Sequence, residues 1–304
     1  MVLTSELATI FFDVITPVFA LVVLGYVAGP RLGLAPRTLT RYAYYILIPA
    51  LILDVIGSAQ VDVTSAIRMI AFAVVTHIAL AGVGWAVARA LGRSEKMVSA
   101  YILIAVFGNV GNFGLPLIEF RLGQEALAAA TVYFLAIMTI AFIIGVAAAS
   151  LPSGGGLKAT WSVFKTPALI ALVPALLLNV THVQPPLFLE RGIDLLAAAT
   201  VPTMLVALGV QLSTLKSFRF TSDVMIASGI RLIAGPILAV TLAVPFGLTG
   251  LERGAGILQA AMPAAILSAI IAMENELIPE FVTTTVLFST LASVVSLTLV
   301  MAFV

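Results

Sequence analysis

The chain contains a series of predominantly apolar runs, each about as long as a bilayer is thick. A helix needs roughly 20 apolar residues to cross the hydrocarbon core of a membrane. Since 62% of the residues are hydrophobic and only 10% are charged, the chain lacks the polar residues that would cover a water-soluble fold. We therefore predict an all-α, multi-pass membrane protein. Its ten predicted helices are residues 8–28, 40–57, 67–88, 97–119, 126–149, 161–181, 193–213, 223–246, 254–273 and 280–303.

Lys and Arg residues are distributed unequally between the two sets of loops. Loops after the first, third, fifth, seventh and ninth predicted helices hold ten of them, whereas the opposite loops hold four. Basic residues are enriched in loops on the cytoplasmic side of a membrane. The sequence therefore predicts that both termini lie on the outer side, extracellular or periplasmic.

The predicted helix 97–119 contains residues that are unfavourable inside a membrane-spanning helix. Its segment Gly108–Pro116 holds three Gly, two Asn and one Pro. Opening a helix in hydrocarbon exposes backbone N–H and C=O groups, so it is tolerated only where protein buries the opening or water lines it. In secondary transporters, broken helices near the membrane midplane build the substrate site. A Gly-rich packing face, with Asn side chains bonding between helices, is the alternative interpretation.

The second half of the chain repeats features of the first in the same order. The sequence TVYF at 131–134 recurs as TVLF at 285–288, and Pro49 is matched by Pro202. The same spacing projects the segment 108–116 onto Met262–Ile270, where a Pro again interrupts an apolar run. Two interrupted helices at corresponding places in two halves of a chain indicate a transporter site.

Each predicted half contains five helices, which is an odd number. The second half must therefore enter the membrane from the opposite side, as an inverted repeat. We predict a first repeat at residues 1–149, a short cytoplasmic linker at 150–159 and a second repeat at 160–304.

Polar side chains near the two interruptions are the candidates for a binding site, because amides can donate hydrogen bonds to a carboxylate. Asn109, Asn112 and Gln259 could instead bond to the facing interruption, and Tyr133 could lie at the membrane interface. The predicted substrate-binding residues are Asn109, Asn112, Gln259, Tyr133 and Pro49. The residues expected to form the crossing interruptions are Gly108, Gly111, Gly114, Pro116, Met262 and Pro263.

Ionisable residues within a membrane span are candidates for ion coupling. Asp54, His77 and Arg231 fall inside predicted helices. Each has a simpler explanation: Asp54 could lie in water at the interface, and His77 could be a hydrogen-bonded core residue. Arg231 could extend to the cytoplasmic interface.

Other function classes lack the residues that they would need. The chain has no Cys and two His, so we predict no disulfide, metal site or cofactor. No paired carboxylates or nucleophile with a base fall within the spans, so we predict no catalytic residues. The net charge of +1 leaves no basic patch for nucleic acid. A channel would need rings of charge or carbonyls, and a sensor usually carries a soluble output domain.

Several motifs together resemble the auxin efflux carrier family, including its bacterial malonate and malate transporters. The most specific is Asn109–Pro116, with Asn seven positions before Pro. The others are Pro17–Phe19, Leu24–Tyr26, Leu47–Leu51, Val201–Pro202, Ala261–Ala264 and Ser289–Ser293. The resemblance covers nearly the whole chain.

This resemblance implies a bile-acid-symporter-like fold. Helices 1, 2, 6 and 7 would form a scaffold, and helices 3–5 and 8–10 a transport domain in which helices 4 and 9 cross at their interruptions. It also implies elevator-type transport, homodimers through the scaffold and a small organic anion as substrate, such as malonate, malate or an auxin-like acid. Asn109 would contact its carboxylate. The short linker at 150–159 favours a prokaryotic carrier in the inner or plasma membrane.

The coupling ion stays open between a proton, sodium and none. The related sodium symporters place an acidic residue and Gln in helix 9, and this chain has only Gln259 there. The alternative function is a sodium-coupled bile-acid or pantothenate-like symporter of the same fold.

Overall fold

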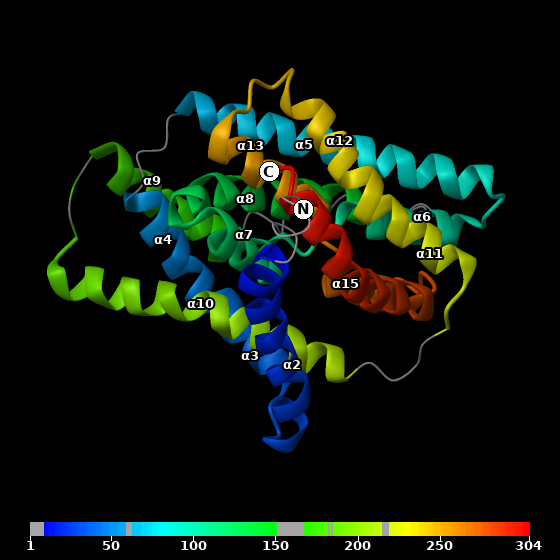
Figure 1. The fold of residues 1–304 in the computed structure, drawn as a ribbon, viewed down its shortest axis with the longest axis horizontal. Coiled ribbons are helices and arrows are strands. Elements are labelled where there is room, and N and C mark those ends of the chain that lie inside the picture. Colours follow the sequence, from blue (N-terminus) through cyan, green and yellow to red (C-terminus); the bar gives the residue numbers. More distant parts are fainter. Residues whose placement is uncertain (1–8, 59–62, 151–166, 182, 184, 215–218) are drawn as a thin grey trace.

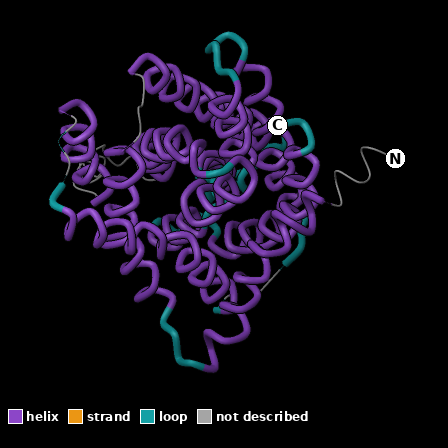
Figure 2. Tube along the Cα trace, turned by 60° about the vertical axis from the view of Figure 1, so that its left-hand side comes forward, coloured by secondary structure: helices purple, strands orange, loops and turns teal. Residues whose placement is uncertain are grey.

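The computed structural model describes residues 9–58, 63–150, 167–181, 183, 185–214 and 219–304, and every regular element in these ranges is helical (Figures 1 and 2). Seven helical stretches are long and apolar enough to cross a membrane. The prediction of an all-α, multi-pass membrane protein is therefore confirmed. The seven stretches are Ile10–Arg31, Pro36–Gly57, Val63–Ala90, Gln124–Gly145, Leu187–Ser213, Ser222–Ala243 and Pro279–Met301.

The other three predicted spans are not single long helices in the described part of the chain. The predicted helix 97–119 is divided into α6 (Glu95–Val106) and η3–α7 (Val110–Leu122), and the predicted helix 254–273 into α13 (Gly250–Ala261) and α14 (Ile266–Glu274). The predicted helix 161–181 appears as α9 (Pro167–Thr181). Apart from Ser150, the predicted linker 150–159 lies outside the described residues.

The long stretches are built from shorter elements with the following bounds. They are η1 (Ile10–Ile15), α2 (Thr16–Arg31), α3 (Pro36–Tyr42), η2 (Ala43–Leu47), α4 (Ile48–Ser58), α5 (Val63–Ala90), η4 (Gln124–Ala126), α8 (Leu127–Ser150), α10 (Leu187–Ser213), α11 (Ser222–Gly229), η6 (Ile230–Ala234), α12 (Gly235–Ala243) and α15 (Pro279–Met301). The broken helix adds η3 (Val110–Gly114) and α7 (Leu115–Leu122).

The four wide helical turns η1, η2, η3 and η6 share one sequence cause. Each ends two residues before a proline, namely Pro17, Pro49, Pro116 or Pro236. Proline has no N–H to donate, and its ring clashes with the carbonyl one turn earlier. A π-helical turn widens the helix at that point and lets it continue across the membrane.

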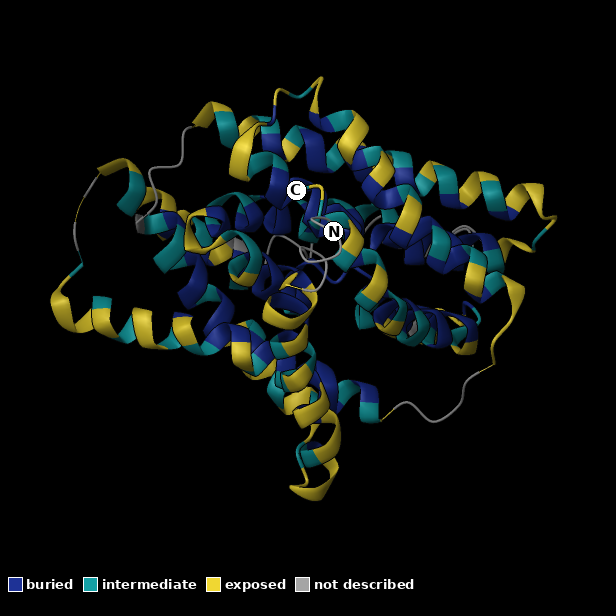
Figure 3. Ribbon diagram, viewed as in Figure 1, coloured by how far each residue is buried: buried dark blue, intermediate teal, exposed yellow. Residues whose placement is uncertain are grey.

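The helices pack in two sets of neighbours. In one set, α2 packs along α10, and α4 packs against α9 and α10. In the other, α5 packs against α6 and α8, α13 against α8 and α12, and α15 against α11 and α14. Figure 3 shows buried residues gathered in the interior and exposed residues along the outer helices. Many exposed residues are large and apolar, such as Val180, Phe188 and Val244, as expected of helices that face lipid.

The contact between α2 and α10 depends on two glycines. A Cβ atom at Gly25 would lie 2.1 Å from the Val206 carbonyl oxygen, and one at Gly209 would lie 1.9 Å from the Val22 carbonyl oxygen. The obstacle in both cases is backbone, which cannot rotate away. Small residues at such positions let membrane helices approach closely.

Replacing Gly209 with Leu is expected to force α2 and α10 apart and to destabilise the protein by at least about 2 kcal/mol. The melting temperature of the purified protein in detergent would measure this loss. The matched control is Gly82→Leu on α5, where an added Cβ has no neighbour within 4 Å. Equal melting temperatures for the two variants would contradict the close approach.

Candidate functional site

The first interruption occupies residues 107–109. α6 begins after Ser94, whose hydroxyl accepts a hydrogen bond from the Met97 N–H at 3.4 Å, and ends at Val106. Phe107 leaves helical geometry with φ −89° and ψ 82°, and Asn109 has φ −78° and ψ 52°. The chain becomes helical again at Val110. The predicted interruption at 108–116 is therefore shorter in the structure, with Gly111 and Gly114 in η3 and Pro116 in the first turn of α7.

The second interruption occupies residues 262–265. α13 ends at Ala261, and the backbone is extended at Met262 (ψ 143°) and Ala265 (ψ 147°) before α14 begins at Ile266. Pro263 lies within this extended segment. The segment Met262–Ile270, onto which the spacing between the two halves projects the first interruption, therefore does contain an interruption.

The two interruptions bond to each other through their backbones. The Asn109 N–H donates to the Pro263 carbonyl oxygen at 2.8 Å, and the Ala265 N–H donates to the Phe107 carbonyl oxygen at 2.8 Å. Gly108 and Ala264 form an antiparallel β-bridge. We call residues 107–109 and 263–265 the paired break. It satisfies backbone groups that hydrocarbon would leave without partners.

A side chain from α15 completes the pairing. The Ala264 N–H donates to Ser289 Oγ at 3.1 Å, and Ser289 Oγ donates to the Val286 carbonyl oxygen at 3.1 Å. Ser289 belongs to a family-like motif, but sequence reasoning gave it no role. Only the fold brings α15 to the break.

Asn109 and Asn112 have different exposures beside the paired break. Asn109 is 6% exposed, and Asn112 is partly exposed. In the described part of the chain, neither side-chain amide makes a hydrogen bond with another residue. A nearly buried amide without a partner carries a free-energy cost, so the Asn109 amide is available to a ligand.

Arg231 lies in η6, between α11 and α12, and is completely buried. Its Nε donates to the Met262 carbonyl oxygen at 2.7 Å and its Nη1 to the Ala105 carbonyl oxygen at 2.9 Å. Its Nη2 is buried without a hydrogen-bond partner among the described residues. The expectation that Arg231 could extend to the cytoplasmic interface therefore does not match its burial at the paired break.

Gln259 joins α13 to two other elements. Its Nε2 donates to the Ala130 carbonyl oxygen on α8 at 3.1 Å. Its Oε1 lies against Gly114, where a Cβ atom would be 2.3 Å away. Gln259 therefore contacts the first broken helix, and Oε1 has no hydrogen-bond partner in the described structure.

Tyr133 and His77 form a buried pair between α8 and α5. His77 Nδ1 lies 3.0 Å from the Ala73 carbonyl oxygen and 3.5 Å from Tyr133 Oη. The rings meet edge to face with centroids 5.7 Å apart. Since both residues are 0% exposed, Tyr133 is not at the membrane interface, and His77 has the setting expected of a core histidine.

Pro49 and Asp54 both lie on α4. Pro49 is partly buried near the start of the helix. Asp54 is also partly buried and lines a cavity of about 600 Å³. None of the predicted substrate-binding residues lines this cavity.

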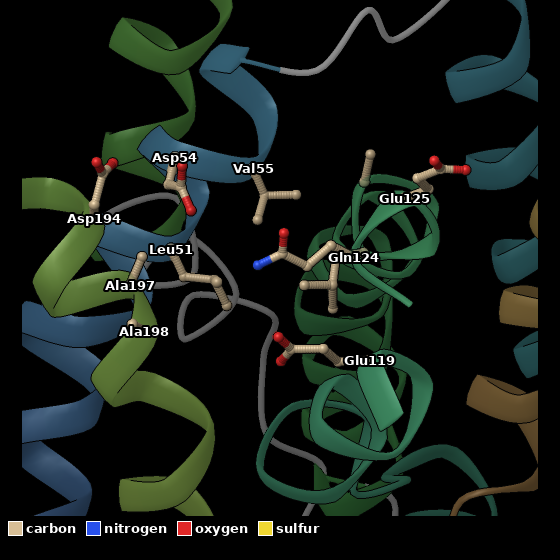
Figure 4. Close-up of a pocket in the computed structure, with 11 residues that line it drawn as sticks. Leu51, Asp54, Val55, Glu119, Gln124, Glu125, Asp194, Ala197 and Ala198 are labelled. Atoms are coloured by element: carbon tan, nitrogen blue, oxygen red, sulfur yellow. The ribbon is translucent and has the colours of Figure 1, made fainter. Parts of the chain in front are cut away.

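The cavity is strongly acidic. Asp54 and Asp194 come from α4 and α10, and across the cavity lie Glu119 of α7, in the first broken helix, and Glu125 of η4, which follows it (Figure 4). No Lys or Arg is among its described lining residues. Sequence reasoning considered only Asp54 of these four carboxylates. Their common position near the ends of predicted helices was a signal that it did not use.

A second polar group, which the sequence did not suggest, ties α6 to α11. Asp223 Oδ1 accepts hydrogen bonds from Tyr101 Oη at 2.6 Å and from Arg93 Nε at 2.9 Å. Tyr101 is in the predicted helix 97–119, and Asp223 is the first residue of the predicted helix 223–246. Nothing in the sequence pairs residues so far apart.

The fold and the paired break define a class of protein. A helical membrane protein with two interrupted helices, held together at their interruptions, is built like a secondary transporter. The model of the family described as "Membrane transport protein" matches residues 10–152 and 156–301. The chain belongs to this family, which confirms the resemblance to the auxin efflux carriers.

Relatives extend over almost the whole chain. An "Uncharacterized transporter" of Methanothermobacter thermautotrophicus is 27% identical over 295 residues, which are 94% of this chain and 96% of the relative. A "Putative malonate transporter" of Rhizobium meliloti is 25% identical over 296 residues, which are 93% of this chain and 92% of the relative. These archaeal and bacterial relatives, which are named as transporters and not as enzymes, confirm the prediction of a multi-pass prokaryotic membrane protein.

Proposed function

We propose that the protein moves a small organic anion across the membrane by alternating access, with the paired break as its substrate site. One observation carries the proposal: the amide of Asn109, which has no hydrogen-bond partner among the described residues, lies where two membrane helices are interrupted. The helical segments that begin at Val110 and Ile266 start at the break. Helix N-termini carry partial positive charge and unpaired N–H groups, which favour an anion.

The substrate class is a carboxylate such as malonate, malate or an auxin-like acid. The name of the Rhizobium meliloti relative supports malonate as the first compound to test. The acidic cavity does not oppose this assignment, because an anion held at the break is surrounded by Arg231, Asn109 and two helix N-termini instead.

The finer architecture is part of the same proposal. Ten spans in two inverted repeats would place both termini outside. The seven long stretches, α9 and the two interrupted helices, counted in the described residues, support the number of ten. The set formed by α2, α4, α9 and α10 would be the scaffold and the dimer contact. The remaining helices would be the transport domain, moving as an elevator.

Thermal unfolding of the purified protein with a panel of small carboxylates tests this function. A ligand present at 100 times its dissociation constant stabilises the folded state by about 2.7 kcal/mol. We expect malonate or a related acid to raise the melting temperature of the wild type but not of Asn109→Ala. We also expect proteoliposomes that contain the wild-type protein to take up this acid.

Two results would contradict the proposal. An acid that stabilises both proteins equally would show that the site lies elsewhere. Stabilisation by amines or sterols, with no effect of any carboxylate, would remove the anion assignment itself.

A further inference from the structure

The guanidinium group of Arg231 is a charge placed completely inside the protein. Removing a cation from water costs several kcal/mol unless the surrounding protein compensates it. No ion pair in the described part of the chain includes Arg231. Its compensation must therefore come from neutral groups, and the two that bind it are the carbonyl oxygens of Ala105 and Met262.

Both carbonyl groups are free because the helices stop. In an uninterrupted helix, Ala105 would accept from the N–H of residue 109 and Met262 from that of residue 266. Instead, the Asn109 N–H donates to Pro263, and α14 only begins at Ile266. The two interruptions thus create two acceptors, and Arg231 binds both.

The position of Arg231 also follows the helix dipoles. α6 and α13 end at the paired break, and the C-terminal end of a helix carries partial negative charge. The guanidinium lies where these two negative ends meet. The two positive ends, at Val110 and Ile266, are left for another group.

The remaining nitrogen of Arg231 is next to the predicted substrate residue. A Cβ atom at Gly108 would lie 1.9 Å from Nη2, so this nitrogen contacts the backbone immediately before Asn109. Nη2 has no hydrogen-bond partner among the described residues. The positive charge is therefore held against the segment that we propose to bind the anion.

We infer that Arg231 is the resident cation of the paired break. It neutralises the two carbonyl ends, which would otherwise attract an inorganic cation, and it supplies the positive charge that a bound carboxylate requires. The anion then binds without sodium. The second part of this inference rests on the proposed function, whereas the first part concerns the protein alone.

Sodium dependence is the first test and needs no variant. The melting temperature of the wild type is measured in sodium chloride and in choline chloride at equal ionic strength, each with and without choline malonate. We expect the same melting temperature in both salts and the same malonate affinity. A rise that is specific to sodium, in either the melting temperature or the affinity, would overturn the inference.

Two variants test the charge. Arg231→Met removes it and is expected to weaken malonate binding at least about tenfold, because a buried charge partner is lost, whereas Arg231→Lys retains a cation and loses less. The control is Arg68→Met on α5, a partly buried Arg that lies 3.9 Å from Glu252; the malonate affinity of this variant should match that of the wild type. Wild-type affinity in Arg231→Met would overturn the inference.

The design separates the two proposals. If Arg231→Met does not fold, the malonate affinity of Arg231→Lys and the wild-type sodium comparison still test the inference. If malonate does not bind the wild type in either salt, the proposed substrate has failed. The resident-cation role is then supported by a melting temperature that does not depend on sodium, and contradicted by one that rises with it.

Discussion

Replacing Gly108 with Ala is expected to destabilise the folded protein by roughly 3 kcal/mol or more, since hydrogen bonds to charged groups contribute about 1.5–3 kcal/mol each. The new Cβ would lie 1.9 Å from Nη2 and 2.7 Å from Cζ of Arg231. The guanidinium would have to move, and both of its hydrogen bonds hold it where it is. The buried charge would then have no compensation.

A double-mutant cycle shows whether Arg231 is the cause. In an Arg231→Met background the guanidinium is absent, so the Gly108→Ala change should cost much less than in the wild type. Contacting residues show such coupling, whereas distant ones add independently. The control is Gly229→Ala, two positions before Arg231, where an added Cβ meets nothing within 4 Å. The explanation is contradicted if the stability losses of Gly108→Ala and Arg231→Met simply add in the double mutant.

Replacing Asn109 with Asp is expected to abolish anion binding while the protein still folds. A carboxylate at this position would face the bound carboxylate, and placing like charges together costs several kcal/mol, which corresponds to a loss of at least about a hundredfold in affinity. Asn109→Ala removes a donor without adding repulsion, so its loss should be smaller. Malonate affinity and proteoliposome uptake would measure both.

Asn112→Asp is the matched comparison for this prediction. It makes the same chemical change three residues later, at a side chain that is partly exposed. We expect a smaller loss of affinity than for Asn109→Asp, because water reduces the repulsion. A larger loss for Asn112→Asp would show that the carboxylate is bound by Asn112. An unchanged affinity for both would exclude this segment as the site.

Local sequence patterns predicted the helices well. Every predicted helix in the described ranges corresponds to between one and three consecutive helical elements, because apolar length and turn residues are local signals. The first interruption was predicted because Gly, Asn and Pro are rare in combination inside a span, and the second because the spacing between the halves projects the first onto a segment that contains Pro263. The four prolines that follow π-helical turns could have been used to predict those turns but were not.

Contacts between distant segments could not be predicted in the same way. The bonds from Arg231 to Ala105 and Met262, and from the Ala264 N–H to Ser289 Oγ, join residues that only the packing of four different helices brings together. The burial of Tyr133 and His77 depends on which face of a uniformly apolar helix turns inward. Hydrophobic periodicity gives no such information when the lipid-facing side is apolar as well.

The paired break also limits how the protein can move. The two broken helices cannot slide apart without separating Asn109 from Pro263 and Phe107 from Ala265, and those groups would find no water in the hydrocarbon core. Arg231 adds a third connection, since it binds both helices at once. The two broken helices, α6–α7 and α13–α14, are therefore joined to each other at their interruptions. If the site changes its depth in the membrane as proposed, α6, α7, α13 and α14 are expected to move together, because sliding of one broken helix past the other would break these backbone bonds.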